Sequence, residues 1–352
     1  MHKHKKECTS MAKIVTFGEI MLRLAPQGYQ RFQQAHCFDA VYGGAEANVA
    51  VSLANYGMDA HYVTAVPANP IGDAAMNALK TFGVDVSDVV RSKKRLGIYF
   101  CEKGVSMRPS KVVYDRADSA IANVKPGDFD WDKIFEGADW FHWTGITPAL
   151  SDGTAAVVLE ACKAAKAHGV KISCDLNYRK NLWTREKAGQ VMGELVPYVD
   201  VLIANEEDSA DVFGIKAEHT DINSGKLDVE GYKSVARQLV ERFGCEKVAI
   251  TLRESLSASD NNWSGMLYDG KPGEISISKK YAIRIVDRVG GGDSFGSGLI
   301  YALLAGYDNE GAVNYAAAAS ALKHTIEGDF NMVTVDEVKS LMGGNASGRV
   351  QR

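Results

Sequence analysis

Segments with the pattern of β-strands and segments with the pattern of α-helices alternate along most of this chain. Strands that alternate with helices form βαβ units, in which parallel strands share one sheet and helices cover its faces. The sequence therefore predicts an α/β fold with a mostly parallel central sheet. The strand patterns occupy residues 13–24, 60–66, 170–177, 199–208 and 246–252, and the clearest helical patterns occupy residues 45–57, 71–85 and 154–169.

Two regions break this alternation. Residues 25–42 contain no helical pattern, and residues 94–120 contain two consecutive strand-like runs joined by a turn-rich link. Two extended insertions in an α/β core predict a small β-sheet beside the main one. Such a flap is a natural lid over a site at the edge of the sheet.

Composition excludes several classes of protein. With 352 residues, 46% of them hydrophobic, the chain can bury a large core as one large domain or two. A net charge of -4 and the lack of a long apolar run argue against a nucleic-acid or membrane partner. The six cysteines have no CxxC spacing and the eight histidines no HExxH spacing. We therefore expect reduced thiols in a cytoplasmic protein, and no zinc site.

The sequence "DRVGGGDSFGSG" at residues 287–298 places three glycines before an aspartate and a helical pattern. The N-terminus of a helix carries unpaired N–H groups and a partial positive charge, and glycines let a phosphate approach them closely. Gly290, Gly291 and Gly292 can therefore form an anion hole. Asp293 is either a general base for a substrate hydroxyl or the N-cap of the helix, and the local residues leave both interpretations open.

Other phosphate-binding motifs do not fit this turn. No lysine follows the glycines as in a P-loop, and Phe295 stands where GxGxxG needs its third glycine. Polar residues that could share a site with the turn follow two predicted strands, because ligands of open parallel sheets bind at the carboxyl ends of strands. They are Asp175, Asn177, Arg179, Asn205, Glu207 and Asp208.

With "GGAEANVA" at 43–50 and "DRVGGGDSFGSGLI" at 287–300, the chain resembles the ribokinase-like (PfkB) carbohydrate kinases. The resemblance implies a ribokinase-like αβα sandwich with a β-sheet lid, which transfers the ATP γ-phosphate to a sugar hydroxyl with Mg²⁺. It makes Asp293 the catalytic base and Gly290 to Gly292 the anion hole. It also implies one kinase domain over residues 13–342, between a flexible extension (1–12) and a flexible tail (343–352), with lid segments at about 25–42 and 94–120.

The resemblance assigns further residues to metal and nucleotide. The magnesium motif of the family falls on Asn205 to Asp208, where aspartate replaces a glutamate and Glu207 is a possible substitute. Thr251, Arg253 and Gly292 are expected near the nucleotide. Tyr315 matches a position near adenine, although ordinary helix packing is the interpretation that we prefer for it.

Many relatives also bind a potassium ion near Asp287. Here Arg288 replaces a small residue, and we hypothesise that it supplies some of that positive charge and weakens any potassium requirement. The alternative is an arginine that points into solvent.

Within the family, the lid and core loops look most like those of 2-keto-3-deoxygluconate kinases. That sugar acid carries a carboxylate, which arginine binds well, and the 6-hydroxyl would be phosphorylated. Alternatives are a kinase of a neutral sugar, such as fructose or a ribosyl compound, and a non-catalytic sugar-binding regulator on the same scaffold. Exposed lid edges predict a homo-oligomer. The expected substrate residues are Gly44, Asn48, Tyr99, Tyr114, Arg116, Arg179 and Asp329, with Arg23 and Arg108 as further basic candidates.

Overall fold

The computed structural model describes residues 11–216 and 229–345. Its main sheet has the strand order β14-β13-β12-β11-β10-β9-β1-β4, with β15 also paired to β13. The strands from β12 to β4 are all parallel, which confirms the predicted α/β fold. These parallel strands are β1 (Lys13–Phe17), β4 (Asp59–Val63), β9 (Trp140–Thr144), β10 (Lys171–Asp175), β11 (Val201–Ala204) and β12 (Lys247–Ser255). The antiparallel strands are β13 (Asp260–Asp269), β14 (Glu274–Ile277) and β15 (Tyr281–Arg284).

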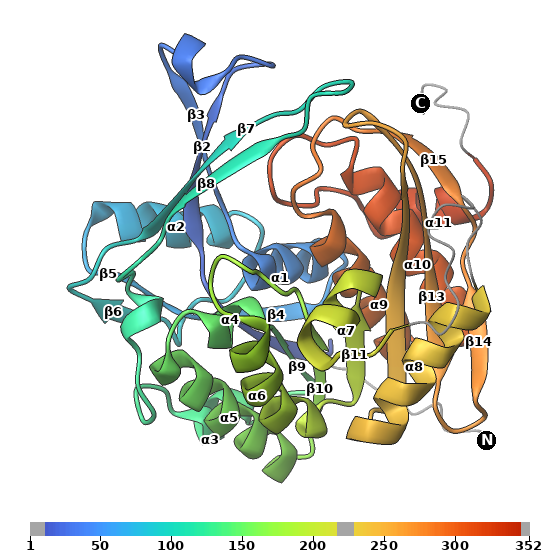
Figure 1. Ribbon diagram of the computed structural model, residues 1–352. Helices are drawn as coiled ribbons and strands as arrows, with labels where there is room; N and C mark the ends of the chain where they lie inside the picture. The colour runs from blue at the N-terminus through green and yellow to red at the C-terminus, as the bar shows by residue number, and fades with distance from the viewer. Residues whose placement is uncertain (1–10, 217–228, 346–352) are drawn as a thin grey trace, which may run out of the picture.

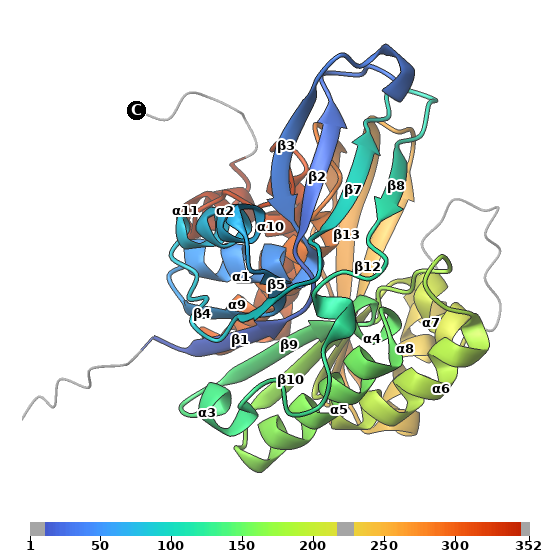
Figure 2. The ribbon, with the colours of Figure 1, turned by 90° about the vertical axis from the view of Figure 1, so that its left-hand side faces the viewer.

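Helices cover both faces of this sheet (Figures 1 and 2). Side chains alternate between the faces along each strand: Val15 packs into one hydrophobic cluster, whereas its neighbour Ile14 packs into another. The helices on the Val15 side are α3 (Trp131–Phe135), α5 (Asp152–Ala167), α6 (Arg185–Leu195), α7 (Glu206–Phe213) and α8 (Val229–Phe243). Those on the opposite side are α1 (Ala45–Asn55), α2 (Pro70–Lys80), α9 (Gly291–Leu304), α10 (Asn309–Lys323) and α11 (Val335–Met342).

A second sheet of four strands, in the order β3-β2-β7-β8, projects from one side of the main sheet (Figure 2). We call it the lid sheet. Its strands are β2 (Met21–Pro26), β3 (Phe38–Gly43), β7 (Gly97–Glu102) and β8 (Lys111–Asp115). A short pair of strands, β5 (Ala65–Pro67) and β6 (Val90–Ser92), and a short helix, α4 (Ile146–Ala149), complete the described elements apart from three single 3₁₀ turns.

The lid sheet corrects one prediction. Residues 13–24 read as a single strand, but the chain leaves the main sheet after Phe17 and enters the lid sheet at Met21. The break lies at Gly18, where a Cβ would lie within 2.0 Å of the Glu46 carboxylate, and at the buried Glu19. Both segments are apolar and alternating, so periodicity alone does not separate them.

The predicted flexible ends fall largely outside the described residues.

Cys37 is exposed, whereas Cys101, Cys162, Cys174 and Cys245 are buried free thiols. In the part of the chain that the structure describes, no helix combines the length and hydropathy needed to cross a membrane.

Candidate active site

A hollow of about 270 Å³ lies between the lid sheet and the carboxyl ends of the parallel strands. We call it the lid hollow. Every residue expected at the substrate or at the reacting hydroxyl lines it, although these residues come from six separate stretches of the chain. They are Gly44, Asn48, Tyr99, Tyr114, Arg116, Arg179, Gly290, Gly291, Gly292, Asp293 and Asp329.

A second hollow, of about 410 Å³, adjoins the first and shares Gly292 with it. We call it the edge hollow. Its lining includes Thr251 and Arg253, which were expected near the nucleotide, and Asn205, Glu207 and Asp208, which were expected near the metal. The residues expected at the sugar and those expected at the nucleotide and the metal thus line adjacent spaces, with the glycine turn between them.

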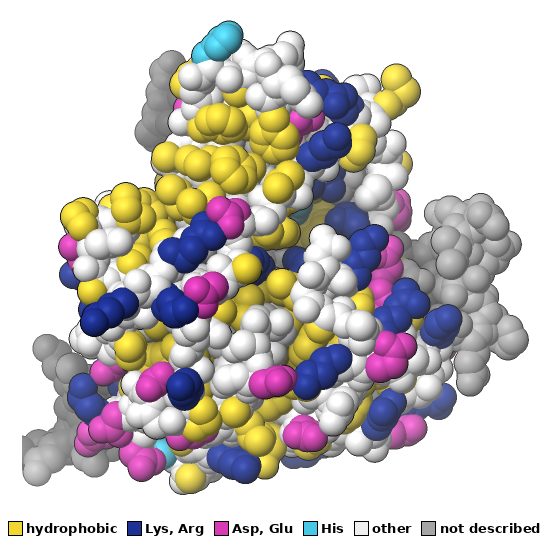
Figure 3. All heavy atoms as spheres, turned by 60° about the vertical axis from the view of Figure 1, so that its left-hand side comes forward, with side chains coloured by type: hydrophobic (Ala, Val, Ile, Leu, Met, Phe, Trp, Pro, Cys, Tyr) yellow, Lys and Arg dark blue, Asp and Glu magenta, His cyan; other side chains and the backbone are white. Residues whose placement is uncertain are grey.

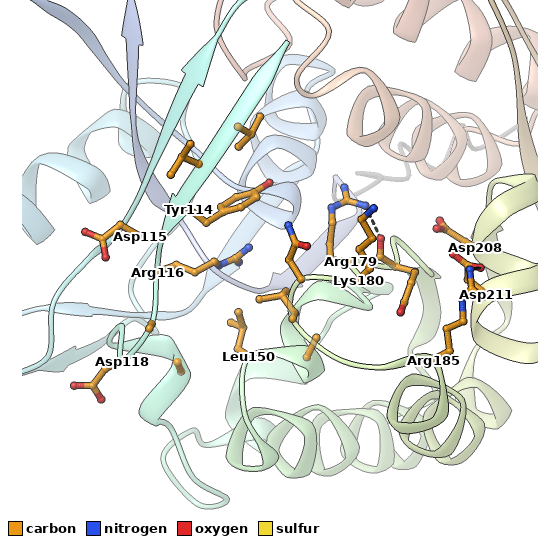
Figure 4. A pocket seen from close by; sticks show the side chains of 18 of the residues that line it. Tyr114, Asp115, Arg116, Asp118, Leu150, Arg179, Lys180, Arg185, Asp208 and Asp211 are labelled. Carbon is orange, nitrogen blue, oxygen red and sulfur yellow. Dashed lines mark hydrogen bonds and ion pairs between the residues drawn. The ribbon is translucent and has the colours of Figure 1, made fainter. Parts of the chain in front are cut away.

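Both hollows open into a mouth of about 960 Å³ under the lid (Figure 3). Figure 4 shows Tyr114 on the lid strand β8, and Arg116 just after the end of that strand, at one side of this mouth. Arg179 and Lys180 project from the loop after β10, and Asp208 lies beyond them on α7. A small molecule can therefore reach the inner hollows from solvent between the lid and this loop.

The glycine turn forms the N-terminus of α9, with Gly290 as the N-cap residue. Gly290 has φ +82°, and a Cβ there would lie 2.2 Å from the carbonyl oxygen of Asp329, so this position requires glycine. The turn is held from behind: the Ser320 hydroxyl donates to the carbonyl oxygen of Gly291 at 2.6 Å. The N–H group of Gly291 donates to the carbonyl oxygen of Arg288 at 3.3 Å, whereas N–H groups at a helix start that have no such partner can bind an anion.

Asp293 lies in the first turn of α9 rather than at its N-cap, so the capping interpretation is wrong. The side-chain amide of Asn48 donates to its Oδ2 at 2.6 Å. The surrounding walls raise the pKa of Asp293 to about 6 by desolvation, although the bond from Asn48 acts in the opposite direction. A carboxylate with this pKa is ionised at neutral pH and is still basic enough to accept a proton.

Arg23, a secondary candidate, is a buried cation behind one side of the lid hollow. Its guanidinium donates to Asp287 Oδ2 at 2.7 Å and to Asp329 Oδ1 at 2.8 Å, and all three side chains are almost fully buried. The Tyr99 hydroxyl donates to Asp329 Oδ2 at 2.5 Å. Tyr99 and Asp329 therefore belong to a rigid network that fixes one side of the lid hollow.

The two arginines expected to bind a carboxylate differ in their surroundings. Arg116 is buried and ion-paired with Glu19, which also accepts from the Ser119 hydroxyl. The half-buried Arg179 donates to the carbonyl oxygen of Tyr178 at 3.0 Å and makes no ion pair within residues 11–216 and 229–345. Of the two, Arg179 is the one whose charge is available to a ligand.

Arg108, the other secondary candidate, lies outside these hollows. It pairs with Glu102 at 3.0 Å and donates to the carbonyl oxygen of Tyr29, so it braces the lid.

The end of β11 and the start of α7 position the expected metal residues. Asn205 is the N-cap of α7: its Oδ1 accepts from the backbone N–H of Asp208 at 2.8 Å, and its amide donates to Asp208 Oδ2 at 2.9 Å. Burial raises the pKa of Asp208 to about 7. Burial and the neighbouring Asp208 and Asp293 also raise the pKa of Asp175, a strand-end residue in both hollows.

This donor set suits a hard cation that keeps much of its water. Carboxylates whose ionised forms are disfavoured by burial and mutual repulsion gain most from a nearby divalent ion. Among the described residues, no group of three acidic, histidine or cysteine side chains is close enough to enclose a metal by itself. Bound phosphates and waters would have to supply the remaining ligands, as is usual for Mg²⁺.

The structure corrects the assignment of Tyr315 to the nucleotide. Its side chain is fully buried in α10, within the hydrophobic core, and its ring packs against Tyr301 and Tyr56 at centroid distances of 4.8 and 5.6 Å. The residues that line the edge hollow beside Thr251 and Arg253 are instead Asn261, Trp263 and His324. Asn261 could not be predicted from a motif, because it lies on the second strand of a long hairpin and comes close to Thr251 and Arg253 only through strand pairing.

Arg288 and Lys323 both lie near Asp287, and the expectation that Arg288 supplies positive charge there stays a prediction. Arg288 is half-buried in the walls of both hollows and donates to the carbonyl oxygen of Ala258 at 3.1 Å. The cation behind the glycine turn is Lys323, whose ammonium faces the carbonyl oxygens of Asp287, Ile326 and Gly328. Sequence inspection did not single out this lysine.

Comparisons with known proteins test the family resemblance. The model of the pfkB family of carbohydrate kinases matches residues 11–334. A 2-dehydro-3-deoxygalactonokinase of Haloferax volcanii is 34% identical over 338 residues, which make up 96% of this chain and 98% of that protein. A crystal structure of a 2-dehydro-3-deoxygluconokinase from Thermotoga maritima is 50% identical, has a TM-score of 0.91, and is matched over 95% of this chain and 99% of its own.

A ribokinase-type protein from E. coli, crystallised with ATP and Mg²⁺, shares the fold, with a TM-score of 0.79 at 20% identity over 95% of this chain and all of its own. The family resemblance drawn from the glycine motifs is thus confirmed over nearly the whole chain. The chain belongs to the pfkB family of carbohydrate kinases.

Proposed function

We propose that this kinase transfers the γ-phosphoryl group of ATP to the 6-hydroxyl of 2-keto-3-deoxygluconate. The observation that carries the proposal is the placement of Asp293 on the glycine turn, facing the lid hollow that all expected sugar residues line. The hollow that adjoins it across Gly292 is the proposed nucleotide site. We assign the whole of residues 13–342 to this one kinase domain, and the reaction to the cytoplasm.

In the proposed reaction, Asp293 accepts the proton of the 6-hydroxyl while the oxygen of that hydroxyl attacks the γ-phosphorus and ADP leaves. The N–H groups of the glycine turn bind the charge that develops on the transferred group. Asn48 holds the Asp293 carboxylate in one orientation. Asn205, Asp208 and Glu207 would hold Mg²⁺ from the edge hollow. When bound, the ion neutralises phosphate charge.

Residues around the sugar have supporting roles. Asn48 and Gly44 lie at the start of α1 and approach the acceptor side of the lid hollow. Tyr114 covers it from the lid, with its ring 5.9 Å from that of Tyr99. The lid would exclude water and so limit hydrolysis of ATP.

Recognition of the sugar-acid carboxylate distinguishes a sugar-acid kinase from a neutral-sugar kinase. We expect Arg179→Leu to raise the KM for 2-keto-3-deoxygluconate about tenfold to a hundredfold, since a charged hydrogen bond contributes roughly 1.5–3 kcal/mol. Turnover of fructose, which has no carboxylate, should start low and change little. A coupled ADP assay over sugar acids and neutral sugars measures both. Arg185→Leu is the matched control, because Arg185 also lines the mouth but is ion-paired with Asp211 at 2.6 Å.

The same assay distinguishes the alternatives. If fructose or a ribosyl compound were the best acceptor for the unaltered enzyme, the arginine argument would be wrong and the enzyme would be a neutral-sugar kinase. The 3-deoxygalactonate isomer, which differs only in the orientation of one hydroxyl, should be among the sugar acids tested. If no acceptor gave ADP although ligands bound, the protein would be a sugar-binding regulator.

We also propose a homodimer formed through the lid sheet. Its outer face carries partly exposed apolar side chains from all four strands, and Figure 3 shows hydrophobic atoms gathered over this part of the molecule. Monomers rarely leave such a continuous patch or free sheet edges uncovered, and a two-fold axis lets the same patch cover itself. The face comprises Leu22, Leu24, Phe38, Ile98, Phe100 and Val113.

Charge on this face is expected to separate the subunits. Light scattering should give the mass of a dimer for the unaltered protein and of a monomer for the double variant Phe38→Asp and Val113→Lys, whose positions are 39% and 52% exposed. Val286→Lys is the control, because Val286 is similarly exposed at 47% but lies outside the lid. An unaltered protein with the mass of a monomer at micromolar concentration would contradict the proposal.

A further inference from the structure

Lys323, the last residue of α10, is fully buried. Lysine is among the residues least often buried completely, and it is then paired. Its Nζ lies 2.7 Å from the carbonyl oxygen of Gly328, 3.3 Å from that of Ile326 and 3.4 Å from that of Asp287. The side chain therefore ends in a small cage of backbone carbonyl groups.

The cage matches an ammonium ion. An ammonium group has three N–H donors and no acceptor, and here three carbonyl oxygens surround it. Burial lowers the pKa of Lys323, but the carboxylates of Asp287 and Asp329 act in the opposite direction. A neutral amine would have only two donors and would leave one carbonyl contact unsatisfied.

The cage lies directly behind the anion hole. A Cβ at Gly290 would lie 3.3 Å from Lys323 Cε and 2.2 Å from the carbonyl oxygen of Asp329. Neighbouring residues of the same helix end also support the turn: Ser320 donates to Gly291, and a Cβ at Gly291 would lie 2.4 Å from the His324 ring. The ammonium thus joins the segment before the turn, at Asp287, to the segment at residues 326–328 that packs against it.

We propose that the Lys323 ammonium is a built-in monovalent cation that positions the glycine turn, so that phosphoryl transfer by this enzyme does not need potassium. Backbone carbonyl oxygens are also the ligands that bind potassium, and a second cation beside the ammonium would meet like-charge repulsion. Lys323 is a positioning residue, because it touches the turn and not the reacting atoms. The inference rests on the proposed function for its kinetic readout only.

The test is chemical rescue of Lys323→Ala. The unaltered enzyme should show less than about a twofold change in kcat between sodium and potassium buffers, whereas the variant in sodium should lose about a hundredfold, as when one donor of an oxyanion hole is lost. Adding ammonium or potassium should then raise the kcat of the variant at least about tenfold above its value in sodium, because each ion fits a cage of carbonyl oxygens. Lithium should not raise it. Lys323→Met, which fills the cage with an apolar chain, should lose activity without rescue.

A second readout needs no substrate. The melting temperature of Lys323→Ala should rise with ammonium or potassium and stay constant with lithium, since an ion that binds only the folded state stabilises it. Lys247→Met is the control: Lys247 is a half-buried lysine paired with Asp269 and Asn309, and its loss should lower stability without any response to cations.

The outcomes separate the two proposals. Strong activation of the unaltered enzyme by potassium, or a Lys323→Ala variant with normal kcat in sodium, would overturn the role of Lys323. An unaltered enzyme that phosphorylates no sugar acid, together with a cation response of the melting temperature in Lys323→Ala, would refute the proposed substrate and retain the cation.

Discussion

Replacing Asp293 by asparagine is expected to lower kcat by about a thousandfold, within the range that general base catalysis contributes. Asparagine keeps the size of the side chain, and it can still contact Asn48 after rotation of its amide. It cannot accept the proton of the sugar hydroxyl. The glycine turn and the nucleotide site are unchanged, so the KM for ATP should change by less than about threefold. Steady-state kinetics with saturating sugar acid measures both quantities.

The pH dependence gives an independent check of this role. A base works in its ionised form, so kcat/KM of the unaltered enzyme should fall as the pH decreases through about 6, where the free Asp293 becomes protonated. The residual rate of Asp293→Asn should lack this inflection. Asp308→Asn serves as control, because Asp308 is the N-cap of α10 and asparagine caps a helix about as well, so neither the rate nor the inflection should change. Near-normal turnover of Asp293→Asn would remove the basis of the proposed mechanism.

Features encoded in consecutive residues could be predicted from the sequence. The glycine turn and Asp293 are adjacent along the chain, so their chemistry follows from the motif and the helix that it begins. Strand and helix periodicity predicted the parallel sheet, and the two interruptions of the alternation fall on strands β3, β7 and β8 of the lid sheet. Asn205 and Asp208 likewise lie within one helical turn of each other.

Contacts between distant segments were the part that the sequence did not reveal. Arg23 and Asp287 are 264 residues apart, and no local pattern says that their side chains meet. Lys323 looks like an ordinary basic residue at a helix C-terminus, where the helix dipole favours it. Tyr315 illustrates the reverse case: its position relative to the motif suggested the nucleotide, but a neighbouring cluster of tyrosines buries it.

The second large effect is expected in stability rather than in chemistry. Arg23→Leu should lower the free energy of unfolding by about 3–5 kcal/mol, because it removes the one partner shared by two buried carboxylates. Asp287 and Asp329 would remain close together in the wall, and an apolar leucine side chain cannot compensate either charge. Urea denaturation followed by circular dichroism measures the change, provided that the slope of the transition is the same for both proteins.

The control and a compensating variant make this prediction specific. Arg95→Leu breaks an exposed ion pair with Asp115 on the surface and should cost less than about 1 kcal/mol. Adding Asp287→Asn to Arg23→Leu should recover part of the loss, because one of the two unpaired charges is then neutral. If Arg23→Leu were no less stable than Arg95→Leu, the buried network would not hold the lid hollow together. Other contacts would then have to keep the wall behind the proposed sugar site rigid. The packing of Tyr99 on Tyr114 is not enough for this, because Tyr114 is exposed.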